Sequence, residues 1–418
     1  MKVVWIVNIP IGPLAKSLNV TASSGSWLTA ALDEVKDPTI QLHVITTCNI
    51  KQDIVITEEG VTYIGLALGS TATYKHSNKN LARWQKILSD ITPDILQIWG
   101  TEYQHALSAI LAKPTDCKAF VYVQGVLESV YNHYFGGLDK HTLSANTSPV
   151  ERISGKTIFQ ARKNIKRSAE NEKQIVTRAD GIILETKWSE DYYRLACGCE
   201  VFYHHALSIN KAFLNAERAK EDVERHTVFT SASDYPLKGV HQLIKALALV
   251  KKQYPTVKLY VPGYKIERNL GWKQKLKTKA YRRYLNKLIT SLDLWNNIIF
   301  TGPLSAEHMA ERMKKANVFV CCSAIENHSS TLREAMHVGV PCISTCVGGV
   351  PEVLQNGYNG ELYDFADSAA LAGRLIALFE NEEYADLLAE RAKKTICDYY
   401  SNHTATLKDI YIQIKQTL

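Results

Sequence analysis

The stretch Glu326-Asn-His-Ser-Ser-Thr-Leu-Arg-Glu334, which continues as Ala-Met-His-Val-Gly-Val-Pro341, contains the strongest indication of how this chain folds. The apolar segment Ala316 to Cys322 precedes it and predicts a buried strand. The Ser-Ser-Thr triplet at 329–331 consists of residues preferred at helix N-caps, so a helix is expected to begin there. In open α/β sheets, ligands bind at the carboxyl ends of the strands. The stretch therefore predicts a strand, a ligand-binding turn and a helix in succession.

Two carboxylates stand at the ends of this turn. Glu326 is expected at the end of the strand, and Glu334 lies about two helical turns further along. Ionised carboxylates accept hydrogen bonds from vicinal hydroxyls, so this spacing suits a sugar at one end and a ribose at the other. Amides at the start of the helix would face a phosphate between them. The alternative for an isolated pair is two glutamates that cap a surface helix.

The segment 326–360 resembles the Glu-x7-Glu motif of family-4 retaining glycosyltransferases, which have the GT-B fold. It also carries the usual sequel of that family, at Gly339-Val-Pro341, Gly348-Gly-Val-Pro-Glu-Val353 and Asn356-Gly-Tyr-Asn-Gly360. The resemblance implies an α/β protein of two Rossmann-like doubly wound domains that face a central crevice. It also implies transfer of a hexose from a nucleotide sugar to a hydroxyl with retention of configuration, in cell-surface polysaccharide or glycoconjugate synthesis.

The resemblance further implies an arginine and a lysine, five residues apart, that hold the diphosphate of the donor. Lys238, followed by Gly239, matches the lysine, whereas Ser233 stands where the arginine is usual and supplies no charge. Glycine before a helix lets the backbone approach an anion, so a second diphosphate contact is expected at Gly25. The catalytic candidates are Lys238 and Glu326. The expected donor-binding residues are Gly25, Ser233, Lys238, Glu326, Asn327, His328, Ser329, Ser330 and Glu334.

Acceptor contacts are expected from the first domain. Glu102 and His105 follow one predicted strand, and Gln124 follows the next; His133 is a further candidate. In many relatives a histidine occupies the position of Gln124, but a glutamine cannot take up a proton, so Gln124 is not expected to act as a general base. For each histidine taken singly, the alternative is a side chain in the core or in solvent.

Short apolar runs alternate with amphipathic segments along the chain, which is typical of two doubly wound α/β domains. We expect an N-terminal acceptor-side domain over 1–205 and a C-terminal donor-binding domain over 206–398. The amphipathic end, 399–418, is expected to form a helix that packs back on the first domain.

Composition places the protein among soluble globular chains. The 418 residues are 46% hydrophobic and 22% charged, and no apolar run approaches the ~20 residues of a membrane span. The run from Met1 to Val7 is interpreted as a first strand instead of a leader. Nine cysteines without a paired framework fit a reducing cytoplasm. No cofactor is expected, because the nucleotide sugar is a substrate. The chain has no Asp-x-Asp triplet, which predicts activity without a metal.

The net charge of +7 is unevenly distributed, since Lys265 to Lys287 contains nine basic residues and one acid. Solvated helix faces are one interpretation of this run. The other is attraction to an anionic membrane or to a pyrophosphate-linked acceptor, with the protein at the inner face of the membrane. The expected partners are therefore a nucleoside-diphosphate sugar and a saccharide or lipid-linked acceptor, and not nucleic acid. Two rival functions remain, a non-catalytic nucleotide-sugar-binding protein and a nucleotide-sugar epimerase on the same fold.

Overall fold

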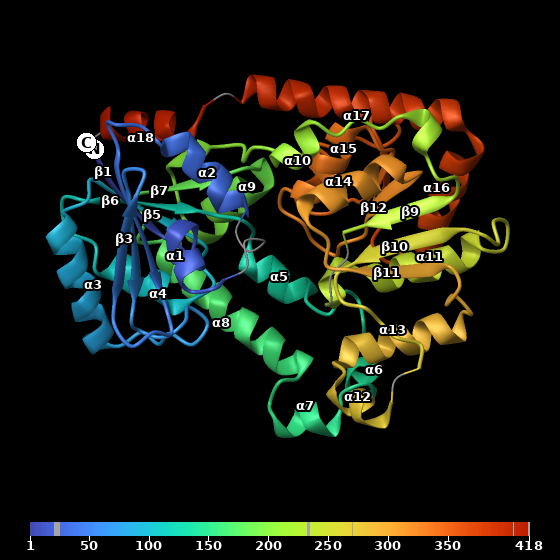
Figure 1. Cartoon of the computed structure of the whole chain (residues 1–418), viewed down its shortest axis with the longest axis horizontal. Helices are drawn as coiled ribbons and strands as arrows, with labels where there is room; N and C mark the ends of the chain where they lie inside the picture. The colour runs from blue at the N-terminus through green and yellow to red at the C-terminus, as the bar shows by residue number, and fades with distance from the viewer. Residues whose placement is uncertain (21–25, 232–234, 270, 404, 417–418) are drawn as a thin grey trace. The chain divides into compact units, whose positions relative to one another are not determined.

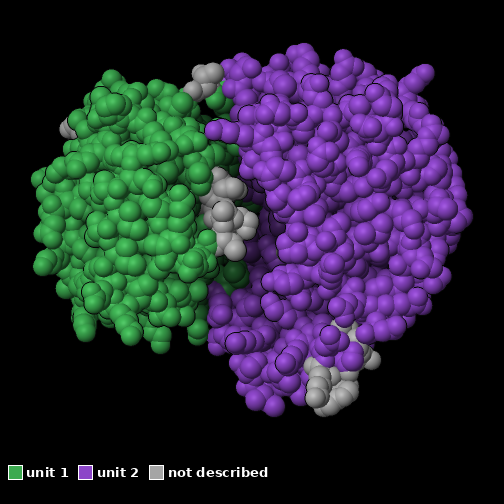
Figure 2. Space-filling model, viewed as in Figure 1, with its two compact units in different colours: residues 1–128, 165–208, 403–418 green, residues 129–164, 209–402 purple. Residues whose placement is uncertain are grey.

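The computed structural model describes residues 1–20, 26–231, 235–269, 271–403 and 405–416 (Figure 1). The chain forms two compact units, coloured separately in Figure 2. Unit 1 comprises 1–128, 165–208 and 403–418, and unit 2 comprises 129–164 and 209–402. The predicted donor-binding residues Gly25 and Ser233 lie outside the described residues.

Unit 1 is built on an eight-stranded sheet with the order β3-β4-β2-β1-β5-β6-β7-β8. All neighbouring strands are parallel except β3 and β4, which pair antiparallel as a hairpin. The strands are β1 Lys2–Ile6, β2 Gln41–Thr47, β3 Ile54–Glu58, β4 Val61–Leu66, β5 Ile95–Trp99, β6 Lys118–Tyr122, β7 Gly181–Leu184 and β8 Phe202–His204. The helices are α1 Gly12–Ser17, α2 Ser26–Val35, α3 Asn78–Ile91, α4 Gln104–Leu111, most of α8 Ile158–Val176, α9 Lys187–Cys197 and α18 Leu407–Gln416.

Both faces of this sheet are covered by helices, because its strands are apolar on both sides. Along β1, Val4 and Ile6 join one buried cluster, while Val3 and Trp5 join the other. The last helix, α18, lies beside α2. Its Tyr411 is fully buried and accepts a hydrogen bond from Trp5 Nε1 at 2.8 Å. The C-terminal segment thus returns to unit 1, but only from residue 403, since the preceding helix α17 continues to Asn402 in unit 2.

Unit 2 contains a six-stranded parallel sheet with the order β11-β10-β9-β12-β13-β14. The strands are β9 Thr227–Thr230, β10 Lys258–Pro262, β11 Ile298–Gly302, β12 Val318–Cys321, β13 Cys342–Thr345 and β14 Glu361–Tyr363. The helices are most of α5 Leu127–His133, then α6 Lys140–Ala145, α7 Pro149–Ile153, α10 Lys211–Leu214, α11 Val240–Val250, α12 Trp272–Lys277, α13 Ala280–Ser291, α14 Ala306–Lys315, α15 Ser330–Val338, α16 Ser368–Glu380 and α17 Glu382–Asn402; short 3-10 turns span Lys220–Asp222, Pro236–Lys238 and Val350–Glu352.

The alternation along β12 explains why helices cover both faces of this sheet as well. Val318 and Val320 pack into a cluster with α11, α13 and α16, whereas Phe319 and Cys321 pack into a cluster with α14, α15 and α17. Because β12 lies between β9 and β13, its carboxyl end is at the centre of the sheet edge. Two Rossmann-like α/β units are the fold that the sequence predicted.

The segment 129–164 belongs to unit 2, which differs from the predicted assignment of all of 1–205 to one domain. Its packing against unit 2 is specific. Gly136 O accepts a hydrogen bond from His241 Nε2 at 2.9 Å, and Glu151 Oε2 pairs with Arg283 Nη2 at 2.9 Å. Among the described residues, no helix combines the length and apolar character that crossing a bilayer requires.

Candidate donor-sugar site

The turn after β12 leads directly into α15, as the sequence predicted. Ser329 is the N-cap residue of α15, although its side chain caps no backbone amide. The first turn of α15 carries no acid. Since the first amides of a helix have no partner within the helix, this end favours an anion. The site therefore begins with an anion-favouring helix end beside the carboxyl edge of the sheet.

Lys238 and Glu326 come together at this edge from two neighbouring strands. Lys238 ends the 3-10 turn between β9 and α11, and its Nζ donates to Glu326 Oε1 at 2.5 Å. Ser323 Oγ donates to the same oxygen at 2.6 Å. Burial opposes the charge on Lys238, but the carboxylate of Glu326 and the nearby Tyr235 outweigh burial and raise the pKa of Lys238 above its usual range. The lysine therefore stays charged at neutral pH.

Two glycines allow these turns to approach each other closely. Gly239 has φ +69°, and a Cβ there would lie 1.7 Å from the carbonyl oxygen of Cys322. Gly348 has φ +54°, and a Cβ there would lie 1.9 Å from the carbonyl oxygen of Glu326. The adjacent Gly349 N donates to that same oxygen at 3.2 Å. Glycine at these positions is therefore a steric requirement for the placement of Lys238 and Glu326.

Glu334 lies on α15, half-buried, and its carboxylate forms no hydrogen bond or ion pair with any described residue. Burial raises the pKa of Glu334 to about 7, although the neighbouring Arg333 acts in the opposite direction. A half-buried acid without a partner is costly unless a ligand supplies hydrogen-bond donors. Glu334 is thus well suited to bind hydroxyl groups.

The two residues that follow Glu326 have buried side chains. Asn327 and His328 are each 7% exposed, and the ring of His328 lies against Tyr399 with centroids 5.3 Å apart. Ser330, at the first position of α15, is exposed. Because the side chains of Asn327 and His328 are buried, their backbone is the part that a ligand can contact.

The acceptor-side candidates do not form one group. Glu102 is half-buried, and Asn8 Nδ2 lies 3.4 and 3.5 Å from its two carboxylate oxygens; burial raises the pKa of Glu102. Gln124 is exposed just after β6. His133 is exposed in unit 2, and its Nδ1 lies 2.8 Å from Ser129 O of its own helix.

The fourth candidate, His105, lies in the core. It has no exposed surface, its Nε2 lies 3.1 Å from Val7 O, and burial lowers its pKa to about 4. His105 is therefore a core residue, which was the alternative to an acceptor contact, because α4 is buried on most of its circumference. The structure gives it no route to an acceptor.

Two residues near these positions were missed from the sequence. Glu172 is 2% exposed and accepts hydrogen bonds from Thr101 Oγ1 at 2.5 Å and Leu127 N at 3.0 Å; burial raises its pKa to about 7. Tyr235 stacks on Tyr134 with ring centroids 6.4 Å apart, three residues before Lys238. Nothing in the sequence of α8 distinguishes Glu172 from the neighbouring Glu170. Tyr235 could have been found, because it is an aromatic residue three positions before Lys238.

Among the residues that the structure describes, no three His, Cys, Asp or Glu side chains are arranged to hold an ion. The described cysteines are all unpaired as disulfides, and five of them are buried near the sheets: Cys48, Cys117, Cys321, Cys322 and Cys342.

Part of unit 2 is similar to a known family of proteins. Residues 214–395 match the model of the family described as glycosyl transferases group 1. An N-acetyl-alpha-D-glucosaminyl L-malate synthase of Bacillus anthracis is 32% identical over 114 residues, which span 27% of this chain and 29% of the synthase. A D-inositol 3-phosphate glycosyltransferase of Corynebacterium urealyticum is 25% identical over 252 residues, or 56% of each chain.

Solved structures match the whole chain. A sucrose-phosphate synthase from Thermosynechococcus elongatus superimposes with a TM-score of 0.69 at 15% identity, covering 100% of both chains. HepE from Anabaena, solved with UDP and glucose, has a TM-score of 0.66 at 15% identity and covers 100% of this chain and 99% of its own. These likenesses confirm the predicted GT-B fold.

Proposed function

We propose that this protein is a retaining glycosyltransferase that moves a hexose from a nucleoside-diphosphate sugar to a hydroxyl acceptor. The observation that carries the proposal is the meeting of Lys238 and Glu326 at the carboxyl edge of the unit 2 sheet, with the unpartnered Glu334 on the helix that follows. The match of 214–395 to glycosyl transferases group 1 supports the donor half. HepE, of the same fold, was solved with UDP-glucose.

Each donor-site residue then has a distinct part to play. Glu326 accepts hydrogen bonds from sugar hydroxyls, and Glu334 accepts them from the ribose. Lys238 and the amides at the start of α15 face the diphosphate, which gains negative charge as the glycosidic bond breaks. Gly25, Ser233 and the backbone of 327–330 complete the proposed donor contacts.

The reaction we propose is a same-face substitution. The bond from the anomeric carbon to the diphosphate oxygen breaks, and the acceptor oxygen bonds to the same face of that carbon. The proton of the acceptor hydroxyl passes to the departing phosphate oxygen. No protein nucleophile and no metal is required in this scheme, because Lys238 and helix amides stabilise the leaving group.

On the acceptor side, Glu102 and Gln124 are the candidates that the structure leaves accessible, and His133 is a separate candidate in unit 2. We propose a saccharide or lipid-linked acceptor in cell-surface polysaccharide or glycoconjugate synthesis. Catalysis would take place in the cytoplasm, with peripheral contact at the inner membrane face.

Thermal-shift and product assays test this function. Purified protein is screened against UDP, GDP and ADP and their hexose derivatives, because a ligand of the folded state raises Tm. Release of nucleoside diphosphate from the sugar that stabilises most, at a rate that Lys238→Ala reduces, supports a transferase. Stabilisation without any hydrolysis or transfer would indicate a binding protein. Conversion of the donor into its epimer without an acceptor would indicate an epimerase.

A further inference from the structure

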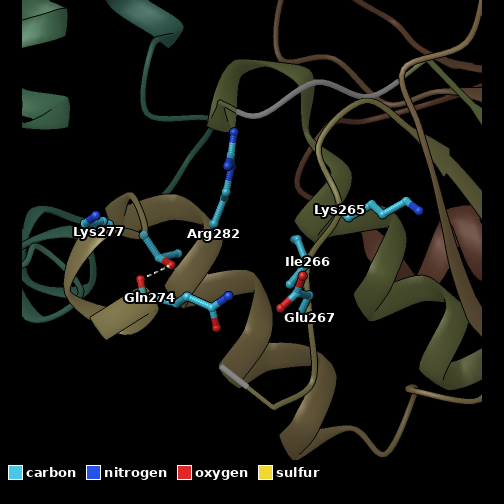
Figure 3. Close-up of a pocket in the computed structure, with 7 residues that line it drawn as sticks. Lys265, Ile266, Glu267, Gln274, Lys277 and Arg282 are labelled. Atoms are coloured by element: carbon cyan, nitrogen blue, oxygen red, sulfur yellow. Dashed lines mark hydrogen bonds between the residues drawn. The ribbon is translucent and has the colours of Figure 1, made fainter. Parts of the chain in front are cut away.

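A pocket of about 270 Å³ lies in unit 2, between the end of β10 and α13 (Figure 3). Its lining residues are Lys265, Ile266, Glu267, Gln274, Lys277, Thr278 and Arg282. In Figure 3 the charged ends of Lys265 and Lys277 point away from each other. The lining side chains therefore do not converge on one small ligand, and the positive charge here faces outward.

The segment that lines this pocket is rich in basic residues. Residues 264–279 contain six basic residues and one acid, in a chain whose net charge is +7. The side chains of Lys265, Arg268, Lys277 and Lys279 are exposed, and none forms an ion pair with a described residue. This charge is therefore available to an external partner.

The short helix α7 adds exposed apolar side chains to the same surface. It packs against α12, as Figure 1 shows. Ile153 is 88% exposed and Val150 is 44% exposed on α7, and Leu276 on α12 is 38% exposed. A single exposed apolar residue is ordinary. Three of them beside a basic segment form a surface of mixed character that suits an amphipathic partner.

Glu151, the one acid in the sequence of α7, is buried and does not contribute to this surface. Glu151 is 7% exposed; its Oε2 pairs with Arg283 Nη2 at 2.9 Å, and its Oε1 accepts from Ala280 N at 3.0 Å. It also completes a capping box with Ser148. The buried pair fixes α7 to α13, so the outward side of α7 offers Ile153 and Val150 without a neighbouring carboxylate on that helix.

We propose that the α7–α12 surface, formed by Val150, Ile153, Leu276, Lys277 and Lys279, docks the protein on an anionic lipid bilayer. Basic side chains are attracted by the negative surface potential, and apolar side chains enter the boundary between headgroups and acyl chains. A second copy of the chain fits less well, because it would place two positive surfaces together. The inference deepens the peripheral contact included in the proposed function, but it does not depend on glycosyl transfer.

Vesicle flotation tests the proposal without any sugar substrate, so its result is independent of the enzymatic assays. The full-length protein is mixed with phosphatidylcholine vesicles that either contain or lack phosphatidylglycerol. We expect it to float with the anionic vesicles alone. Ile153→Ser should weaken partitioning about tenfold, the value expected for losing one buried aliphatic side chain. The double variant Lys277→Glu/Lys279→Glu should weaken it about 30-fold or more.

Matched controls come from unit 1. Leu195 on α9 is 85% exposed, so Leu195→Ser removes a comparable apolar side chain elsewhere. Lys51 and Lys86 are exposed lysines, so Lys51→Glu/Lys86→Glu makes the same change in net charge. Both controls should float as the unchanged protein does. Equal loss in controls and test variants, or equal binding to neutral vesicles, would overturn the proposal. So would a change from dimer to monomer on Ile153→Ser without any flotation of the unchanged protein.

Discussion

Lys238 Nζ and Glu326 Oε1 lie 2.5 Å apart, and this ion pair joins the turn after β9 to the turn after β12. The two residues have different proposed partners, the diphosphate for the lysine and the sugar for the glutamate. Because each fixes the position of the other, their contributions to donor binding and to turnover should be coupled.

The first prediction concerns Lys238. Lys238→Ala removes a positive charge from the leaving group, where negative charge grows in the transition state. Turnover should fall about 100- to 1000-fold, as when one electrostatic donor is lost elsewhere. Steady-state kinetics with the donor found by the thermal-shift screen measures this. Lys252→Ala, at an exposed lysine just after α11, is the control and should retain its rate.

Coupling between the pair is the second prediction. In a cycle of Lys238→Ala, Glu326→Gln and the double variant, the double variant should lose less than the sum of the single losses. Residues in contact typically show interaction free energies of about 0.5–3 kcal/mol. The quantity to compare is kcat/KM for all four proteins. Strict additivity would mean that the two side chains act separately, contrary to the geometry.

Glu334 supplies a prediction about pH. Its folded pKa of about 7 lies above its reference value of 4.5, so the folded state binds more protons than the unfolded state between these values. The contribution of Glu334 to the free energy of unfolding is therefore most favourable below the reference value and decreases as pH rises toward 7. Glu334→Gln should remove this decrease, so its stability relative to the unchanged protein should rise from about pH 5 to about pH 8.

Urea unfolding at both pH values measures the effect, with Glu390→Gln as a control at an exposed glutamate of α17. Donor binding provides an independent measurement. Ribose hydroxyls donate best to an ionised carboxylate, so affinity for the nucleoside diphosphate should increase as pH rises toward 7, and Glu334→Gln should weaken binding and flatten this dependence. An unchanged affinity in calorimetry would remove Glu334 from the donor site.

The strand, turn and helix around β12 and α15 could be predicted because the apolar run and the N-cap residue both indicate the same boundaries. The apolar run before Cys322 forms the strand, and Ser329 is the N-cap of the helix. The strand β14, Glu361–Tyr363, was missed because three residues are too short to show a period. In the site, Lys238 and Glu326 were each predicted as donor-binding residues, but no contact between them was predicted. Their ion pair joins residues 88 positions apart, and no local pattern reports such a contact.

Residues 127–176 were the least predictable part of the chain. The helices α5 to α8 carry no motif of the resembled family, and the membership of 129–164 in unit 2 depends on contacts with residues more than 100 positions away. The burial of Glu151 is an example, since a glutamate in a basic surface segment looks solvated until Arg283 is placed beside it. His105 was misjudged for a different reason. Its position after a predicted strand suggested an acceptor contact, but its side chain is buried in the core.

Metal dependence is the next prediction. The sequence contains no Asp-x-Asp triplet, and the proposed mechanism stabilises the diphosphate with Lys238 and helix amides. Turnover in excess chelator should therefore equal turnover in added magnesium or manganese. Activity that chelator abolishes and either ion restores would overturn the metal-free mechanism.

The last prediction concerns Gly348, and it distinguishes two effects of an added Cβ. One is the clash with the carbonyl oxygen of Glu326, and the other is the strain of a positive φ. This glycine has φ +54°, and a Cβ there would lie 1.9 Å from the carbonyl oxygen of Glu326. Gly357 also has a positive φ, +71°, but the nearest atom to a Cβ there is Tyr384 Oη at 3.9 Å. Gly357→Ala should lose about 1–3 kcal/mol of stability, the usual cost of a strained backbone conformation. Gly348→Ala should lose more, because its Cβ would also clash with a backbone carbonyl. Only Gly348→Ala must also displace Glu326, and so it alone should raise KM for the donor and lower kcat. Chemical denaturation measures the stability of the two variants, and steady-state kinetics measures their KM and kcat. Similar kinetics for both would show that the Gly348 turn contributes to folding alone, and that Glu326 keeps its position without it.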